Sequence, residues 1–421
     1  MTAPAPTRAA LGLLAVLTAL NVLNFIDRQL VGSLAPLLIA ELGLSRAAIG
    51  LLQGFAFVLV YTVAGLLLGH IADRTSRPRL IAGGLAVWSA ATALSGLAQG
   101  FGHLALARML VGVGEAALTP AALSMLADVL PVSWLGRAAG IYYAGVSIGA
   151  GLSLVVAGLV APALGWRACF LGLGVAGLLA AAAVAWLRDP RTSRAVTHRP
   201  ADAHPSTAGT ARDLAALLRG APALVLTMLG GALTTFAAAS GIHWLTWLVE
   251  ERGFTFRRAA FLAGAIYAVA GLCGNVLGGW FADWCERRWR GGRIWSMVVT
   301  VLALLPFALL FLFTPPNTPV FFACWFLTAM GSTTWYGPLF ATAQDFAPPR
   351  IRSTTVAFLM LVINVLGVGL GPWITGLIGD RVSLTRGILV SLVVGACSVV
   401  PLAIAARRCE QDWRRVNPGP A

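Results

Sequence analysis

The sequence predicts an all-α membrane protein with twelve transmembrane helices in two pseudo-symmetric six-helix bundles. Three observations lead to this fold class. The 421 residues are 58% hydrophobic and 11% charged, with a mean hydropathy of +0.82, whereas a soluble globular chain has about 25% charged residues. The apolar residues gather in long runs, and a pattern of Gly and Pro in the first half returns in the second.

The apolar runs are separated by short polar segments, and each is long enough to cross a bilayer as a helix, which takes about 20 residues. The predicted spans are 11–40, 47–71, 80–100, 104–127, 137–162, 166–187, 221–249, 258–281, 294–313, 320–343, 354–379 and 387–406. The first run is too long for the apolar core of a signal peptide and is itself a span.

One connection is much longer than the others. Residues 188–220 combine arginines with Pro, Ser, Thr and Ala, a composition typical of a polar linker. We therefore expect an N-terminal bundle over 1–187, a cytoplasmic linker over 188–220 and a C-terminal bundle over 221–421.

Internal repetition supports two halves. Gly and Pro set backbone geometry, so coincidences of these residues at one offset are less often chance than apolar ones. Parallel repeats about an axis along the membrane normal characterise one large class of transporters. The matched positions are Pro120 with Pro338, Pro131 with Pro349, Gly149 with Gly367 and, at a slightly shorter offset, Asp73 with Asp283.

The arginines predict the orientation. With the N-terminus inside, 21 of the 30 basic residues fall in loops or tails on the cytoplasmic side and 7 on the other. Loops rich in Arg stay in the cytoplasm, so both termini are predicted to be cytoplasmic. This bias also explains the net charge of +14 without a nucleic-acid partner. We expect a multi-pass protein of the cell inner (plasma) membrane.

The first span carries charge inside its apolar run. Asn24, Asp27 and Arg28, together with Asn21, fall within about a 120° arc of one helix. A charge at the centre of a bilayer costs about 2.5–3.5 kcal/mol on insertion scales, so it faces a protein or aqueous interior and marks a candidate functional site. The alternative is a structural ion pair that holds helices together.

The fourth span places Arg108, Glu115 and Thr119 within about a 60° stripe. Asp27 and Glu115 lie at similar depths, so we hypothesise a coupled cluster of Asp27, Arg28 and Glu115. One arginine neutralises one carboxylate well, which favours a proton on the other and gives a basis for proton coupling. The alternative is a permanently ionised structural triad. Arg108 either holds an anionic substrate group or pairs with Glu115.

Two motifs identify a family. The loop Gly69-His-Ile-Ala-Asp73-Arg74-Thr-Ser-Arg77-Pro-Arg79 resembles the G-x-x-x-D-R-x-G-R-[RK] signature of the major facilitator superfamily, with Ser76 in place of the second glycine. Arg108-Met-Leu-Val-Gly112-Val-Gly114-Glu115 resembles its R-x-x-x-G-x-G motif. Gly279-Trp-Phe-Ala-Asp283 is a degenerate second copy of the loop.

This resemblance implies roles for more residues. The superfamily loop is implied to brace spans and to form a cytoplasmic gate, which assigns the gate to Asp73, Arg74, Arg77, Arg79 and Asp283. Spans 1, 4, 7 and 10 line the path in the superfamily. The predicted substrate-binding residues are accordingly Asn24, Arg108, Thr119, Trp335 and Tyr336, and span 10 is expected to bend at Gly337-Pro338.

A narrower likeness is to the spinster-like group, carried by Asn24-Phe-Ile-Asp27-Arg28, Gly114-Glu115-Ala116 and Gly337-Pro338. It implies transport of lysolipids or sphingoid lipids, and the scarcity of polar groups in the spans agrees with an amphipathic substrate. The anion:cation symporter group has a similar first-span motif, so a proton-coupled symporter of small organic anions is the alternative. A drug or metabolite exporter is another.

Other classes of function lack their motifs. The sequence contains no HExxH, CxxC or GxxxxGK[ST], so we expect no enzyme activity, metal, cofactor or nucleotide-driven pumping. The expected partners are a small or lipid-like substrate, protons and the bilayer, and the chain is expected to be monomeric. His243, beside Trp244 and Trp247, is interpreted as part of an aromatic belt at the membrane surface.

Overall fold

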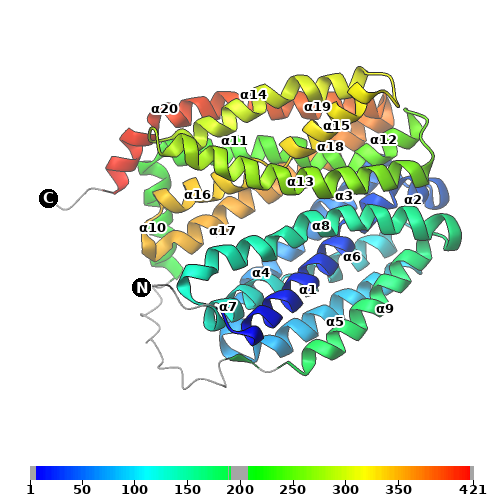
Figure 1. Cartoon of the computed structure of the whole chain (residues 1–421), viewed down its shortest axis with the longest axis horizontal. Helices are drawn as coiled ribbons and strands as arrows, with labels where there is room; N and C mark the ends of the chain where they lie inside the picture. Colours follow the sequence, from blue (N-terminus) through cyan, green and yellow to red (C-terminus); the bar gives the residue numbers. More distant parts are fainter. Residues whose placement is uncertain (1–5, 188, 191–206, 418–421) are drawn as a thin grey trace. The chain divides into compact units, whose positions relative to one another are not determined.

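The computed structural model describes residues 6–187, 189–190 and 207–417, and these residues contain helices and no strand. Contacts between residues divide the chain into two compact units. The first comprises Met1–Arg199 and Leu245–Ala268, and the second Pro200–Trp244 and Val269–Ala421. Figure 1 follows the helices in chain order by colour.

The helices of the first unit reach from α1 to α9 and include α12. Pairs distant in sequence pack side by side: α1 lies along α8, and α5 lies between α6 and α9. Their bounds are α1 (Arg8–Ser33), α2 (Ala35–Leu42), α3 (Arg46–Gln53), α4 (Phe55–Arg74), α5 (Arg77–Ser95), α6 (Phe101–Glu115), α7 (Leu118–Val129), α8 (Val132–Leu164), α9 (Trp166–Ala185) and α12 (Trp244–Glu250).

In the second unit, α11 packs against α20, α19 and a π-helical segment, and α14 packs against α15 and α20. α13 (Phe256–Glu286) contributes residues to both units. The remaining helices are α10 (Thr207–Gly220), α11 (Pro222–Ala239), α14 (Gly292–Phe313), α15 (Pro319–Gly331), α16 (Tyr336–Phe346), α17 (Arg352–Val362), the π-helical Ile363–Gly369, α18 (Leu370–Arg381), α19 (Leu384–Cys397) and α20 (Val399–Val416).

Ten helices in the described ranges are long and apolar enough to cross a membrane, by length and composition alone. They account for all but two of the predicted spans. Those two, 80–100 and 320–343, are also helical, as α5 and as α15 with α16. The all-helical fold is confirmed, whereas the count of twelve transmembrane helices and the cytoplasmic placement of both termini stay predictions.

Two of the predicted spans are each divided into two helices by a short break. α3 and α4 meet at Gly54, whose backbone (φ −90°, ψ −99°) is not helical. α15 and α16 are separated by residues 332–335, so the expected bend lies just before Gly337-Pro338. Pro338 then falls in the first turn of α16, where a proline removes no intrahelical hydrogen bond.

The predicted linker is partly helical. α10 covers 207–220, and Leu214, Leu217 and Leu218 recur on it at the spacing of one helix face. Residues 188 and 191–206 of that linker lie outside the described part of the chain. The division into bundles at 1–187 and 221–421 stays a prediction, although contacts assign Leu245–Ala268 to the first unit.

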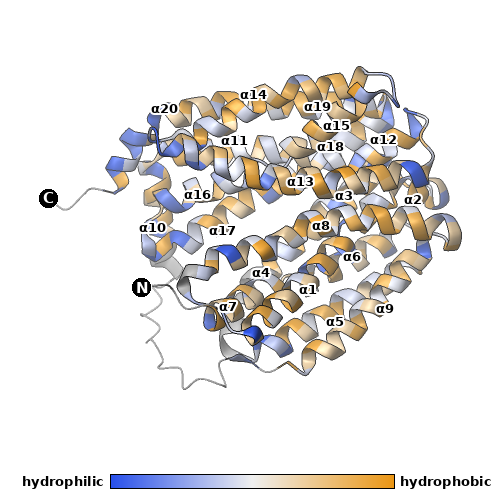
Figure 2. Ribbon diagram, in the orientation of Figure 1, coloured by the Kyte–Doolittle hydropathy of each residue, from blue (hydrophilic) through white to orange (hydrophobic). Residues whose placement is uncertain are grey.

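Polar and apolar residues are segregated along the helices. Figure 2 shows α14 covered with hydrophobic residues and the C-terminal turns of α20 with hydrophilic ones. The arginines of that end, Arg407, Arg408, Arg414 and Arg415, follow directly on the apolar part of the span. This arrangement is expected of helices whose middle faces hydrocarbon and whose ends face water.

Glycines allow close helix packing around the interior of the first unit. A Cβ at Gly112 of α6 would lie 2.9 Å from the Phe57 carbonyl oxygen of α4. A Cβ at Gly114 would lie 2.5 Å from the Gly84 carbonyl oxygen of α5. α6 therefore touches both neighbours through backbone, which brings the side chains of α4 and α5 close to those of α6.

Candidate functional site

A cluster of four charged side chains lies in the interior of the first unit. Asp27, Arg108 and Glu115 are 1%, 0% and 2% exposed, and Arg28 is half-buried. α1 supplies Asp27 and Arg28 from adjacent positions, and α6 supplies Arg108 and Glu115 from one face. The sequence prediction that spans 1 and 4 bring their ionisable groups together agrees with this geometry.

The first ion pair joins Asp27 to Arg108. The Arg108 guanidinium lies 3.4 Å from the Asp27 carboxylate, and it also donates to the Arg28 carbonyl oxygen at 3.4 Å. The Thr92 hydroxyl of α5 donates a short hydrogen bond to the second oxygen of Asp27. Both Asp27 oxygens are therefore satisfied in a site closed to water, which buried carboxylates require.

The second ion pair joins Arg28 to Glu115, with 3.5 Å between Arg28 Nε and Glu115 Oε2. Neither Glu115 oxygen accepts a hydrogen bond of ordinary geometry within the described structure. The Asn24 amide lies next to this carboxylate, and its Nδ2 also lacks an acceptor there. Glu115 is therefore the less satisfied of the two acids, although it is as deeply buried as Asp27.

Aromatic rings surround the Arg28 guanidinium. Its carbon lies 5.2, 4.4 and 4.6 Å from the ring centroids of Phe25, Phe57 and Tyr61. Cation–π contacts of this kind hold a guanidinium whose side chain is still 22% exposed. Phe57 also lies 5.3 Å from the Arg108 guanidinium, so one ring contacts both cations.

The geometry corrects one of the two expectations for Arg108. Its ion pair is with Asp27 and not with Glu115, and its role as a contact for an anionic substrate group stays a prediction. The predicted cluster of Asp27, Arg28 and Glu115 therefore has a second arginine, with one ion pair for each acid. Helix periodicity placed Arg108 and Glu115 on one face but did not show which neighbour each would meet.

Thr119 and Tyr142 form a polar contact in the same unit, with 3.1 Å between their hydroxyl oxygens. Tyr142 of α8 packs edge to face on Tyr143 at 5.4 Å. The backbone carbonyl oxygen of Tyr142 accepts a hydrogen bond from Asn21 Nδ2 at 2.8 Å. Of these residues the sequence predicted Thr119. Thr92 had no role assigned, because a hydroxyl in an apolar run carries no distinguishing pattern.

Trp335 and Tyr336 belong to the second unit. Trp335 is 2% exposed and donates through Nε1 to the Ser332 carbonyl oxygen at 2.8 Å. Tyr336 is exposed and stacks on Trp335 with 4.0 Å between ring centroids. Of this pair only the Tyr336 ring is exposed. The role of both residues as substrate contacts stays a prediction.

The predicted gate residues divide between the two units. Arg77 is fully buried and contacts Asp189 at 2.7 Å, Asp128 at 2.5 Å and Ser124 at 2.8 Å. It thereby ties the start of α5 to the end of α7 and to the segment after α9. Asp73 and Arg74 end α4, and their side chains lie outside the described structure.

In the second unit Asp283 lies 3.4 Å from Arg293, which also pairs with Asp345. Arg79 is exposed at the start of α5. No group of three or more His, Cys, Asp or Glu side chains suited to a metal ion occurs among the residues that the structure describes. The six cysteines are free thiols.

The chain matches known transporters over almost its full length. The model of the Major Facilitator Superfamily matches residues 17–372. A crystal structure of a bacterial homolog of the human lysosomal transporter Spinster, inward-facing and unoccupied, aligns with a TM-score of 0.84 and 25% identity, covering 97% of this chain and 99% of that one. The chain belongs to the Major Facilitator Superfamily, and it is therefore a multi-pass membrane transporter and not an enzyme.

Within that superfamily it is spinster-like. Protein spinster homolog 1 of Homo sapiens is 30% identical over 90% of this chain and 75% of its own length. An MFS-type efflux pump of Mycolicibacterium smegmatis is 29% identical, over 89% and 86%. Two relatives are named for different substrates: the sphingosine-1-phosphate transporter SPNS2 of Mus musculus (25%; 87% and 69%) and a hexuronate transporter of Bacillus subtilis (26%; 87% and 87%).

Proposed function

We propose that this chain is a proton-coupled secondary transporter that moves an amphipathic or lipid-like small molecule, such as a lysolipid or sphingoid lipid, by alternating access. The observation that carries the proposal is the unequal pair of buried acids. Asp27 has two hydrogen-bonding partners in a closed site, whereas Glu115 has one ion pair at 3.5 Å and no hydrogen bond of ordinary geometry.

Glu115 is the proton carrier in this scheme. A buried carboxylate with few hydrogen-bonding partners keeps much of the cost of its charge, and this favours a proton on Glu115. Protonation of Glu115 neutralises the partner of Arg28. The Arg28 guanidinium, held by three aromatic rings and 22% exposed, is then available to an anionic group. Proton loading and substrate binding are coupled through this one arginine.

The surroundings of Arg28 favour a substrate that is charged at one end and apolar elsewhere. Apolar ring faces come from Phe25, Phe57 and Tyr61. The nearby polar groups are few, with one hydroxyl each from Thr119 and Tyr142. A free sugar needs many hydrogen-bonding partners, because a buried hydroxyl without one costs about 1–3 kcal/mol. The relative named as a sphingosine-1-phosphate transporter supports the same class.

Two alternatives belong to the same superfamily. In the first, Arg28 and Arg108 bind a small organic anion that enters with a proton, and the hexuronate transporter among the relatives supports it. In the second, the chain exports drugs or metabolites, and the relative named as an efflux pump supports it. In each alternative, two six-helix halves rock about a central site. The protein lies in the inner membrane, and both of its termini are on the cytoplasmic side.

The test of proton coupling uses purified chain in liposomes with an imposed pH gradient and a fluorescent lysolipid. Glu115→Gln keeps the shape of the side chain and removes its titration. We expect gradient-driven accumulation to be lost while exchange without a gradient persists. Glu410→Gln neutralises an exposed acid of α20 and is the matched control. Accumulation that still follows the pH gradient in Glu115→Gln contradicts the proposal.

The test of substrate class is competition in the same liposomes. A lysolipid and a hexuronate are each added in excess against the labelled lysolipid. Inhibition by unlabelled lysolipid alone supports the amphipathic substrate. Stronger inhibition by hexuronate, together with uptake of labelled hexuronate, favours the organic-anion symporter instead.

A further inference from the structure

Gln53 joins the second predicted span to the main chain of the charged cluster. It is the last residue of α3 and comes directly before Gly54, whose backbone is not helical. Its Nε2 donates to the Arg28 carbonyl oxygen at 2.7 Å and to Gln29 Oε1 at 3.0 Å. The amide therefore uses its donors on two successive residues of α1, and the first of them carries the guanidinium that pairs with Glu115.

The Arg28 carbonyl determines which way the Gln53 amide points. A carbonyl oxygen only accepts hydrogen bonds, so the amide nitrogen and not the amide oxygen has to face it. This orientation leaves Gln53 Oε1 buried with no hydrogen-bond partner among the residues that the structure describes. The cost of burying that oxygen offsets much of what the two hydrogen bonds contribute to stability. Their main consequence is therefore the position of Arg28.

The Arg28 carbonyl lies where the two ion pairs of the cluster meet. Arg108, which pairs with Asp27, also donates to this oxygen at 3.4 Å. The guanidinium of the same residue pairs with Glu115 and contacts the Phe57 ring of α4. Arg28 is thus held at its main chain from α3 and at its side chain from α4. A shift of its main chain would change both ion pairs.

The non-helical residue Gly54 separates these two contacts. On one side of it, α3 packs against α1. On the other side, α4 packs against α6, where the Phe57 carbonyl oxygen faces Gly112. Because a junction of this kind can absorb a change in angle, α4 can tilt with its rings while Gln53 still holds the main chain of α1.

We propose that Gln53 is a positioning residue of the proton site: its amide holds the main chain of Arg28, and the guanidinium thereby stays within reach of Glu115. The inference rests on the proposed function, in which Glu115 carries the proton. Without the amide, the main chain at Arg28 loses one of its contacts and the guanidinium spends less time beside the carboxylate. An acid that loses a nearby cation holds its proton more readily.

The groups around this ion pair decide what a pH measurement reports. The other charged and titratable side chains there come from α1, α6, α4 and α8, and they are Asp27, Arg108, Tyr61, Tyr142 and Tyr143. A tyrosine titrates at about pH 10, so the tyrosines keep their charge between pH 6 and pH 8. None of the five is hydrogen-bonded to Gln53 in the described part of the chain. A substitution at Gln53 therefore acts on the pH profile through Arg28.

The first experiment measures accumulation of a fluorescent lysolipid by the full chain in liposomes, at a series of pH values. Gln53→Met keeps the length of the side chain and removes its donors. We expect its pH profile to move toward higher pH by about half a unit or more. Gln53→Asn, which keeps the amide and shortens its reach, should move the profile in the same direction. Asn21→Leu removes a bond of the same kind, from an amide of α1 to the Tyr142 carbonyl oxygen, and its profile should not move.

The second experiment is thermal unfolding in detergent, which needs no transport. The fall in Tm caused by Gln53→Met should shrink by about half or more in a Glu115→Gln background, because the effects of coupled residues do not add. Additive losses of Tm overturn the positioning role. An unmoved pH profile in Gln53→Met also overturns it when Glu115→Gln has lost its response to the gradient. A Glu115→Gln variant that still responds contradicts the proposed function, and the unfolding comparison then decides on Gln53 alone.

Discussion

Among the residues that the structure describes, a cluster of charged side chains lies in the interior of the first unit, whereas the buried charge of the second unit lies at one end. Asp27, Arg108 and Glu115 are buried together in the first. In the second, the buried polar side chains that the structure describes are hydroxyls, His243 and Asp412, and Asp412 lies near the end of α20. The first unit therefore holds the ionisable groups of the proposed proton site. The second holds hydroxyls that donate to its own backbone.

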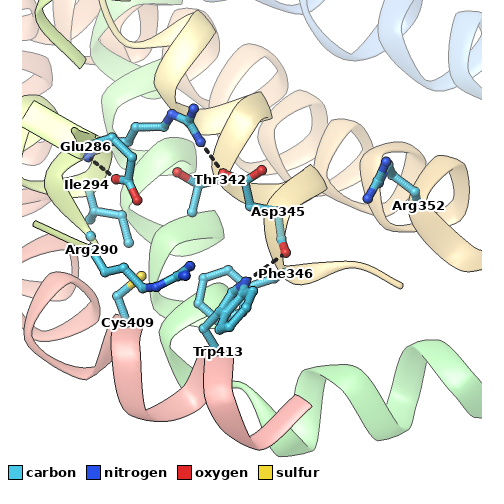
Figure 3. A pocket seen from close by; sticks show the side chains of 11 residues that line it. Glu286, Arg290, Ile294, Thr342, Asp345, Phe346, Arg352, Cys409 and Trp413 are labelled. Atoms are coloured by element: carbon cyan, nitrogen blue, oxygen red, sulfur yellow. Dashed lines mark hydrogen bonds and ion pairs between the residues drawn. The ribbon is translucent and has the colours of Figure 1, made fainter. Parts of the chain in front are cut away.

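The predicted cytoplasmic ends differ in the opposite sense. Arg77 of the first unit is fully buried among Asp128, Asp189 and Ser124. Arg293 lies at the start of α14 in the second unit, where it is 23% exposed and lines a cavity (Figure 3). The first unit is thus braced at its end and charged inside, whereas the second has few charges inside and a cavity at its end. Four predictions probe this contrast.

The largest effect is expected for Arg108→Ala. It leaves Asp27 buried with Thr92 as its remaining side-chain partner, and removing one member of a buried ion pair costs about 3–5 kcal/mol. We expect a large loss of thermal stability in detergent, and partial recovery when Asp27→Asn is added. Arg290→Ala, an exposed arginine of the second unit, is the control. Equal stability of Arg108→Ala and the unchanged chain would show that this pair is not a structural necessity.

Arg77→Ala and Arg293→Ala compare the two ends directly. Arg77 is fully buried and has three side-chain partners. We therefore expect its loss to lower the free energy of unfolding by about 3 kcal/mol or more. Arg293 is partly solvated, and its loss is expected to cost about 1 kcal/mol. Thermal unfolding of both variants under one set of conditions measures the difference. A larger shift for Arg293→Ala would reverse the proposed assignment of a braced and an open end.

Gly112→Ala tests the packing that supports the charged cluster. Its Cβ would meet the Phe57 carbonyl oxygen at 2.9 Å, so α4 and α6 must separate at a cost of about 1–3 kcal/mol. The rings of Phe57 and Tyr61 would then move relative to Arg28, and we expect slower lysolipid transport. Gly102→Ala, in the same helix with open space around it, should leave transport unchanged. Equal transport by both variants would exclude a packing role for Gly112.

The smallest effect is expected for His243→Phe. His243 is fully buried and its Nε2 contacts the Pro372 carbonyl oxygen at 2.7 Å, which makes it a link between helices and corrects its interpretation as a membrane-surface residue. Losing this contact is expected to cost about 1 kcal/mol. The pH dependence of transport should not change. A shifted pH profile would place a second titrating group in the second unit and weaken the contrast.

Much of the fold can be predicted from the sequence, because a helix that crosses a bilayer needs a long apolar run. α10 could not be predicted in this way. The run 207–220 is too polar to span, so only the spacing of Leu214, Leu217 and Leu218 marks it as a helix. The acids and arginines of the site stand out against apolar neighbours. Their pairing does not, since Arg108 meets Asp27 only after α6 and α1 pack together, and Thr92 resembles any other hydroxyl in its span.

The π-helical turn at Ile363–Gly369 sets the register of the helix that follows it. A π turn accommodates one residue more than an α turn. Closing this segment into ordinary α geometry with every residue kept would rotate everything beyond it by about 100° relative to α17. Pro372 would swing away from His243, and the glycine contact of Gly371 on Phe236 would be lost. The contacts of α18 with Phe236 and His243 therefore depend on the wide turn that precedes it.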